Sequence, residues 1–166
     1  RVLFRSNDGN EYIKILGRFD NERLYKWFRR DYINRPINLD RYKIVLPKAN
    51  GSGAIGEVLS TPLIGEPLIG YTETFIAIGA FITEFEAKAC LKYIKGKFSR
   101  AMLGILKITQ DNTKETWRKV PIQDFTPNSD IDWSQSIENI DQQLYKKYDL
   151  SQDEIDFIES KVRAMD

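Results

Sequence analysis

The chain has 166 residues, of which 42% are apolar and 30% charged, as in an ordinary soluble globular protein. It has no histidine and a single cysteine, Cys90, which excludes zinc sites built on His or Cys ligands, histidine acid–base catalysis and Ser-His-Asp triads. One cysteine also excludes an intrachain disulfide and suits a reducing compartment, and no apolar run approaches the ~20 residues of a membrane span. We therefore expect a cytoplasmic protein without a membrane partner.

The net charge of +1 hides an uneven distribution of charge along the chain. Residues 1–119 contain 21 Lys and Arg against 13 Asp and Glu, whereas residues 120–166 contain 4 against 11. A basic body with an acidic tail indicates a polyanion-binding surface on the body and a tail that avoids DNA, although surface ion pairs within each part explain the same totals. Because the chain starts at Arg1 and not at Met, we expect a piece of a larger protein.

The first third of the chain is rich in strand-forming residues. Residues 2–4 and 12–16 predict short strands separated by a turn at 7–10. Residues 23–33 are basic and aromatic together, and we expect the aromatic side chains to lie in the core rather than to stack on bases. Residues 42–46 predict another strand, which ends at Pro47.

The middle of the chain predicts an irregular loop and then two helices. Glycines and prolines punctuate the sequence from 47 to 70, and residues 71–78 predict a strand. Thr83 with Glu86 is a capping-box pattern that opens a helix, for which Gly96 is a possible break. A second helix is expected from 99 to about 108, and a short strand from 117 to 122.

The tail predicts a helical hairpin. Ser134 is the expected cap of a helix with Ile137, Ile140, Leu144 and Tyr145 on one face, and Ser151 with Glu154 opens a second helix. We thus predict an α+β fold: a body of mixed strands with two helices over residues 1–125, then a hairpin over 126–166. The hairpin is expected to pack on this body or on a missing part of the parent.

Two Glu-x-Lys triplets, Glu86 to Lys88 and Glu159 to Lys161, match part of the pattern with which many nucleases hold Mg²⁺. Both fall in predicted helices and neither follows a Pro-Asp pair, so we interpret them as solvated helix faces. The chain also lacks nucleotide-binding glycine motifs and the Asn-Pro-Pro-Tyr of adenine methyltransferases. We expect no catalysis from this chain, with a small Mg²⁺-dependent nuclease as a rival hypothesis.

Several stretches together resemble the C-terminal target-recognition region of bifunctional type II restriction–modification enzymes and related N6-adenine DNA methyltransferases. They are residues 48–53 (KANGSG), 56–62 (GEVLSTP), 103–112 (LGILKITQDN), 120–125 (VPIQDF) and 129–133 (SDIDW). The order of strands and helices is also similar to that of a restriction specificity domain. The resemblance runs from about Tyr42 to the C-terminus and is looser before it.

In that family this region reads the DNA sequence, and the methyltransferase core and nuclease lie elsewhere in the chain. The resemblance therefore implies a non-catalytic domain, without a cofactor of its own, that recognises a short site on double-stranded DNA. The parent would be a DNA adenine methyltransferase and endonuclease that uses S-adenosylmethionine and Mg²⁺. The expected partners are duplex DNA and the catalytic domains of the parent. The alternative is a protein-interaction or assembly module of the same enzyme, without base readout.

DNA readers place Lys and Arg on phosphates and Asn, Gln, Arg or Lys on base edges. Residues of these types occur in the Gly-rich loop, on and just after the second predicted helix, and in the basic aromatic segment. The candidate DNA-binding residues are Lys48, Asn50 and Ser52; Arg100, Lys107, Thr109, Gln110, Asn112 and Lys114; and Lys26, Arg29 and Arg30. A structural turn and a solvated helix exit are the alternative interpretations of the two loops.

Overall fold

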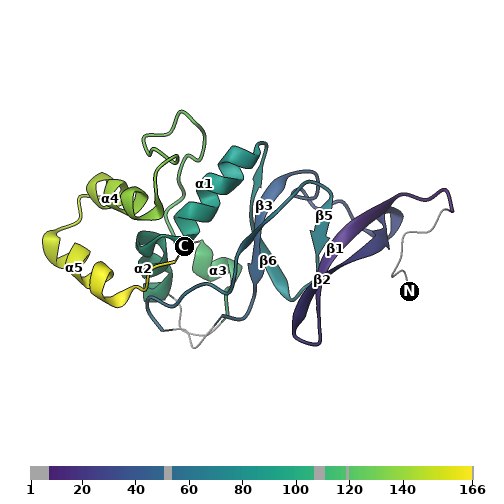
Figure 1. Cartoon of the computed structure of the whole chain (residues 1–166), viewed down its shortest axis with the longest axis horizontal. Coiled ribbons are helices and arrows are strands. Elements are labelled where there is room, and N and C mark those ends of the chain that lie inside the picture. The colour runs from purple at the N-terminus through teal and green to yellow at the C-terminus, as the bar shows by residue number, and fades with distance from the viewer. Residues whose placement is uncertain (1–7, 51–53, 107–110, 119, 166) are drawn as a thin grey trace.

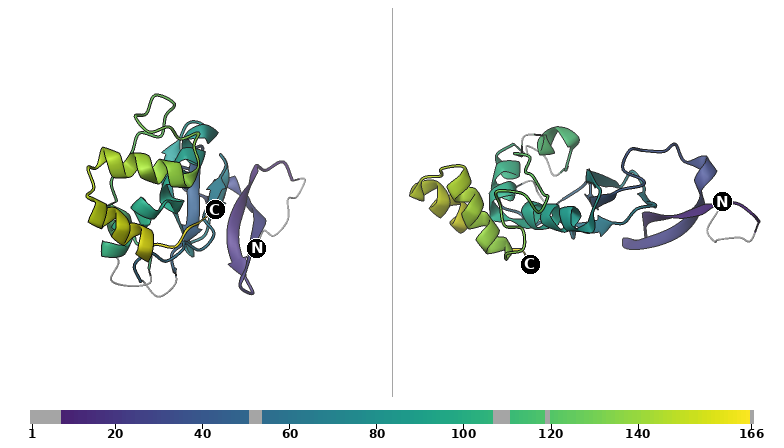
Figure 2. Two further views of the ribbon diagram at one scale, coloured as in Figure 1. Left: turned by 60° about the vertical axis from the view of Figure 1, so that its left-hand side comes forward. Right: turned by 90° about the horizontal axis from the view of Figure 1, so that it is seen from above.

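The computed structural model describes residues 8–50, 54–106, 111–118 and 120–165. Within these ranges the fold is α+β, with two small sheets and five α-helices, which confirms the predicted fold class. The molecule is elongated, with helices α4 and α5 at one end and strands β1 and β2 at the other (Figures 1 and 2).

The first sheet is a two-stranded ribbon to which a third, short strand adds. Strands β1 (Tyr12–Phe19) and β2 (Glu22–Arg29) are antiparallel, and β5 (Ile69–Tyr71) pairs with β1 in parallel. Asp20 and Asn21 form the connection with φ values of 47° and 64°, the left-handed backbone that suits the twist of a two-residue hairpin. The 3₁₀ turn η1 (Arg30–Tyr32) follows β2.

The second sheet has the order β4–β3–β6, with β3 (Tyr42–Pro47) between β4 (Leu63–Gly65) and β6 (Phe75–Phe81). Side chains on both faces of β3 are buried, because Ile44 and Leu46 contact the helical core while Val45 packs with residues of the ribbon side. Strand β3 therefore joins the two layers of the molecule.

The helices begin and end at local signals. Helix α1 (Glu84–Lys95) opens with the predicted capping box of Thr83 and ends at Gly96, after which α2 (Lys97–Leu106) begins at once. Helix α5 (Gln152–Lys161) opens with the predicted capping box of Ser151, but α4 (Ile137–Lys147) is capped by Ser136, not by Ser134. The short α3 (Lys114–Trp117) is capped by Thr113.

The C-terminal hairpin shares one core with the body. Ile140, Leu144 and Ile158 are buried together with residues of α1, α2 and β3. A buried carboxylate adds to the contact, since Asp141 of α4 accepts hydrogen bonds from the amides of Lys97 (2.8 Å) and Phe98 (3.0 Å) at the start of α2. The hairpin thus packs on the body of this chain, which is one of the two arrangements that the sequence left open.

Three local predictions were wrong. The strand expected at 71–78 is two strands, because a turn at Thr72 separates β5 from β6. The described residues of 117–122, which leave out 119, form no strand; α3 occupies the start of this range, and Pro121 has no amide hydrogen for a sheet. The segment expected as an irregular loop up to Gly70 contains β4 and β5.

The aromatic side chains of the basic segment are also not in the core. Tyr25, Phe28 and Tyr32 are 48%, 36% and 61% exposed. The ribbon projects from the rest of the molecule, so little of the chain covers them (Figure 1). In the part of the chain that the structure describes, no helix has the length and apolar character required to cross a bilayer.

Lys43 provides a pH-dependent test of the fold. Its side chain is fully buried in β3, where Nζ donates to the carbonyls of Arg41 (3.1 Å), Glu66 (3.1 Å) and Leu39 (3.4 Å). Burial lowers the pKa of Lys43 from 10.5 to about 8. Because the unfolded chain then binds the proton more tightly, the free energy of unfolding should rise by about 2 kcal/mol between pH 8 and pH 10.

The measurement is urea unfolding at pH 8 and at pH 10, for the wild type and for Lys43→Met. The variant cannot titrate at this position and should lose most of the rise. An equal rise in both proteins would contradict the assignment to Lys43.

Candidate nucleic-acid interface

The described ends of the two loops that the sequence singled out, residues 48–50 and 111–112, lie side by side. Ala49 and Asp111 form an isolated antiparallel bridge, and the amide of Asn112 donates to the carbonyl of Lys48 over 2.5 Å. The Asn112 side chain adds a bond from Nδ2 to the carbonyl of Pro47 (3.2 Å). Two exposed lysines, Lys48 in one loop and Lys114 at the start of α3 just after the other, therefore come from adjacent segments of one surface.

The asparagines of these loops hold the backbone rather than face solvent. Asn50 is 3% exposed; its Oδ1 accepts from the amide of Ser60 (2.5 Å) and its Nδ2 donates to the carbonyl of Val58 (3.0 Å). Asn112 is 1% exposed, and its Oδ1 is buried without a hydrogen-bond partner among the residues described. DNA binding by Asn50 and Asn112 stays a prediction, and in the structure both amides are turned to the backbone of the chain itself.

Arg100 is buried too and does not present its charge to a phosphate. Its guanidinium donates to the carbonyls of Lys95 (2.9 Å), Glu57 (3.2 Å), Gly56 (3.5 Å) and Arg163. Burial lowers its pKa to about 10. Arg100 of α2 thus connects the end of α1, the 56–57 segment and the end of the chain. The local sequence around Arg100 did not indicate that these segments cover it.

The three ribbon candidates do not join the loops. Lys26 pairs with Ile15 across the ribbon and lies 5.2 Å from the ring centre of Phe19. Arg29 forms an ion pair with Asp31, and Arg30 forms ion pairs with Glu11 (2.9 Å) and Asp40 (3.5 Å). Acidic partners thus neutralise the two arginines. The remaining candidates, Ser52, Lys107, Thr109 and Gln110, lie outside the described residues.

Two basic residues that the sequence analysis missed lie next to the Gly-rich loop. Arg18 and Arg23 line a hollow together with Pro47 and Ala49. Their equal separation from the Asp20–Asn21 turn was a usable signal, because a two-residue hairpin pairs the residues that flank it at equal distances. Lys161 and Arg163 of the tail also line a hollow, with residues 54–58 and Ser60, so part of the acidic tail adds positive charge beside this surface.

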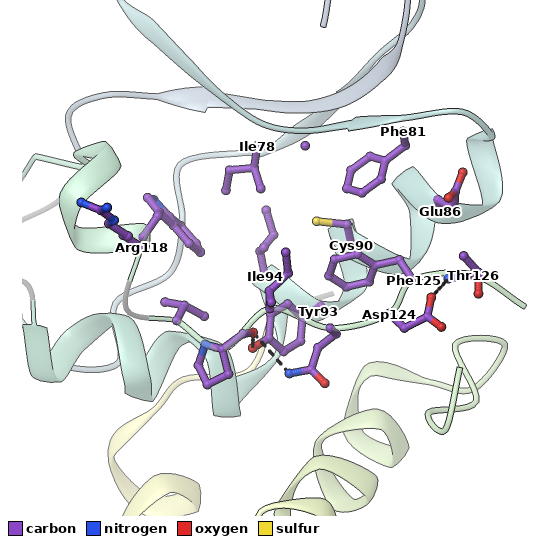
Figure 3. Close-up of a pocket in the computed structure, with 16 residues that line it drawn as sticks. Ile78, Phe81, Glu86, Cys90, Tyr93, Ile94, Arg118, Asp124, Phe125 and Thr126 are labelled. Carbon is purple, nitrogen blue, oxygen red and sulfur yellow. Dashed lines mark hydrogen bonds between the residues drawn. The ribbon is translucent and has the colours of Figure 1, made fainter. Parts of the chain in front are cut away.

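A larger and mostly apolar cavity of about 620 Å³ lies between β6, α1, α3 and residues 120–126 (Figure 3). Phe81, Cys90, Tyr93 and Phe125 contribute to its wall, and the Tyr93 hydroxyl donates to the carbonyl of Pro121 (2.6 Å). Burial raises the pKa of the Cys90 thiol to about 12, so the thiol is neutral and a poor nucleophile at neutral pH. The cavity suits an apolar group and does not suit a phosphate.

The glutamates of the two Glu-x-Lys triplets take part in the fold. Glu86 accepts from the amide and the hydroxyl of Thr83 in the capping box, at 2.8 Å each. Glu159 accepts from the Tyr145 hydroxyl (2.9 Å) and pairs with Lys97. Within the ranges that the structure describes, no group of three or more His, Cys, Asp or Glu residues is placed to hold a metal ion.

The new roles of Asn50 and Arg100 can be separated from that of Lys48 by stability measurements. Asn50→Ala should lower the free energy of unfolding by about 2 kcal/mol, because it leaves a buried amide and a carbonyl unpaired. Arg100→Met should lower it by about 3 kcal/mol or more, because four backbone carbonyls lose the donation from this buried guanidinium. Lys48→Ala, at an exposed position, should change it by less than about 0.5 kcal/mol. Urea unfolding of the three variants measures these changes. An Arg100→Met protein as stable as the wild type would contradict the structural role of Arg100.

Comparison with protein-family models, with curated proteins and with solved structures finds no significant match to this chain. The resemblance to restriction–modification enzymes therefore stays a prediction.

Proposed function

We propose that this chain is a non-catalytic domain that recognises a short sequence on double-stranded DNA, within a larger restriction–modification enzyme. The observation that carries the proposal is the pairing of the two loops through Ala49, Asp111 and Asn112. Both loops contain residue types that DNA readers use. Two such loops on one surface are what a DNA reader requires, because several side chains must meet one groove at once.

The distribution of charge supports the same proposal. Strands β1 and β2 contain Lys14, Arg18, Arg23, Lys26 and Arg29 against two acidic residues in and between them, Asp20 and Glu22. The acidic helices α4 and α5 lie at the opposite end of the molecule (Figure 1). A polyanion would therefore be attracted to the ribbon and the loops and repelled by the helical end.

The surface divides by role in this proposal. Lys48 and Lys114, both exposed, bind backbone phosphates. Asn50 and Asn112 act as positioning residues, because their side chains fix the loops from inside. Ser52, Thr109 and Gln110 stay candidates for contact with base edges. Methyl transfer from S-adenosylmethionine and Mg²⁺-dependent cleavage would belong to the parent's other domains.

The alternative of an assembly module is favoured by one observation. Ile122, in the wall of the apolar cavity, is 90% exposed, and Ile82, the residue after β6, is 72% exposed. Exposed apolar side chains beside a cavity are typical of a surface that another protein covers. Ile82 and Ile122 do not belong to the two loops. DNA recognition therefore predicts that variants of the loops lose binding, whereas assembly predicts that variants of these isoleucines do.

The proposal is tested by fluorescence anisotropy with a labelled random-sequence duplex over a series of salt concentrations. If phosphate contacts drive binding, the logarithm of the binding constant should fall linearly with the logarithm of salt concentration. The double variant Lys48→Ala/Lys114→Ala should bind up to about tenfold more weakly than the wild type. The slope of the salt dependence should fall by up to about 2, because each phosphate contact contributes about 0.9.

Lys88→Ala is the matched control, since Lys88 is an exposed lysine on α1 that pairs with Glu84 (2.9 Å), far from the loops in sequence. It should bind as the wild type does. Absence of binding even at low salt, or a double variant indistinguishable from the control, would refute the DNA-reader proposal and favour the assembly module. If the wild type binds and the double variant binds more weakly, selection from a random duplex library shows whether one sequence is preferred.

A further inference from the structure

Four parts of the chain line a polar hollow of about 250 Å³ at the junction of the two sheets. Arg18, Asn21 and Arg23 come from the hairpin end of the ribbon, and the remaining wall comes from the end of β3 and from two short segments. The other lining residues are Pro47, Ala49, Ser60, Thr61, Thr74 and Phe75. The volume equals about eight water molecules, enough for one tetrahedral oxyanion with bridging waters.

The hollow contains positive charge without a negative partner. Arg18 and Arg23 are direct cross-strand partners, an arrangement that costs stability because like charges repel. No Asp or Glu lines the hollow, and among the described residues no carboxylate forms an ion pair with either arginine. Arg29 and Arg30 at the other end of β2 do have acidic partners, so the absence is local to this pair.

Arg23 is held in place before any ligand arrives. Its guanidinium donates to the carbonyls of Thr61 (2.6 Å) and Ser60 (2.8 Å), and its central carbon lies 5.7 Å from the ring centre of Phe75. Both acceptors are neutral, so they orient the charge without cancelling it. Burial first, and then the charge of Arg18, lower the pKa of Arg23, which means that its charge is less favourable here than in water. A bound anion would relieve this.

The backbone that orients Arg23 is itself strained. Thr61 has a φ of 42°, in the left-handed region that β-branched residues avoid. Such conformations persist where the surrounding structure enforces them, and they concentrate at ligand sites. Here the strained residue supplies one of the two carbonyls that fix Arg23, and it also lines the hollow.

We propose that this arginine hollow binds a phosphate group, with Arg18 and Arg23 supplying the positive charge and the hydroxyl residues Ser60, Thr61 and Thr74 lining the remainder. A phosphodiester of a DNA backbone and a free phosphate ion share this chemistry. That the phosphate belongs to DNA rests on the proposed function, whereas the binding of phosphate itself does not. The hollow lies against Ala49, so a backbone phosphate there would place the duplex beside the paired loops.

The first test titrates the protein with sodium phosphate at constant ionic strength, balanced with sodium chloride, and follows the midpoint of thermal unfolding and the heat of binding. Phosphate should stabilise the wild type more than chloride does. Arg18→Gln should bind phosphate at least about tenfold more weakly and should fold, because Arg18 is exposed and its removal ends a like-charge contact. Arg18→Lys should keep part of the affinity.

Arg35→Gln is the matched control, an exposed arginine in the loop before β3 that does not line the hollow. It should bind phosphate as the wild type does. Stabilisation by phosphate no greater than by chloride, or an Arg18→Gln protein that binds as well as the control, would overturn the proposal.

A second arm separates the two sources of the phosphate. If the ligand is a DNA phosphodiester, dimethyl phosphate should bind, and Arg18→Gln should weaken duplex binding as well. If it is a free phosphate, inorganic phosphate should bind in an Arg18-dependent manner while duplex binding stays unchanged. Phosphate binding by a protein that shows no affinity for duplex DNA would support the hollow and refute the DNA-reader proposal.

Discussion

A single buried guanidinium holds together the parts of the chain that shape the candidate surface. Arg100 donates to Lys95 at the end of α1, to Gly56 and Glu57, and to Arg163 near the C-terminus. Four backbone carbonyls from three separate segments of the chain thereby accept from one side chain. The contact between residue 56 and the tail is so close that only glycine fits, because a Cβ on Gly56 would lie 2.3 Å from the carbonyl oxygen of Lys161.

A series of hydrogen bonds connects Arg100 to the surface. The 56–61 segment is fixed at its start by Arg100 and further along by Asn50, which contacts both Val58 and Ser60. The carbonyls of Ser60 and Thr61 then orient Arg23. Arg100 and Asn50 therefore stabilise the backbone of the 56–61 segment, although their residue types are those of DNA contacts. Arg23 is oriented by this segment and presents its charge in the hollow.

The same arrangement separates the charges of the molecule. The acidic hairpin packs on α1 and α2 through an apolar core and through Asp141, so it cannot lie against the ribbon. The ribbon keeps its positive charge at the far end, and only some of that charge is neutralised by nearby acids. A long molecule with unlike ends orients itself in the field of a polyanion, which favours approach by the ribbon and the loops.

The amino-acid sequence by itself determined the features whose causes lie within a few residues. The capping boxes at Thr83 and Ser151, the break at Gly96 and the strand that ends at Pro47 were all predicted, because each depends on a side chain and a backbone group in one turn. The α+β class followed from these elements. The cap at Ser136 and the turn at Thr72 were missed, since neighbouring residues offered equally good local signals.

Only the tertiary structure decided which polar residues face solvent. Asn50, Asn112 and Arg100 have the residue types of DNA contacts, yet all three are buried, and Asn112 and Arg100 bond to segments more than 60 residues away in the sequence. The pairing of the two loops, and the meeting of Arg18 and Arg23 with Ala49, also depend on how the sheets pack. Burial is a property of segments far apart along the chain that come together, and local periodicity carries no information about which segments those are.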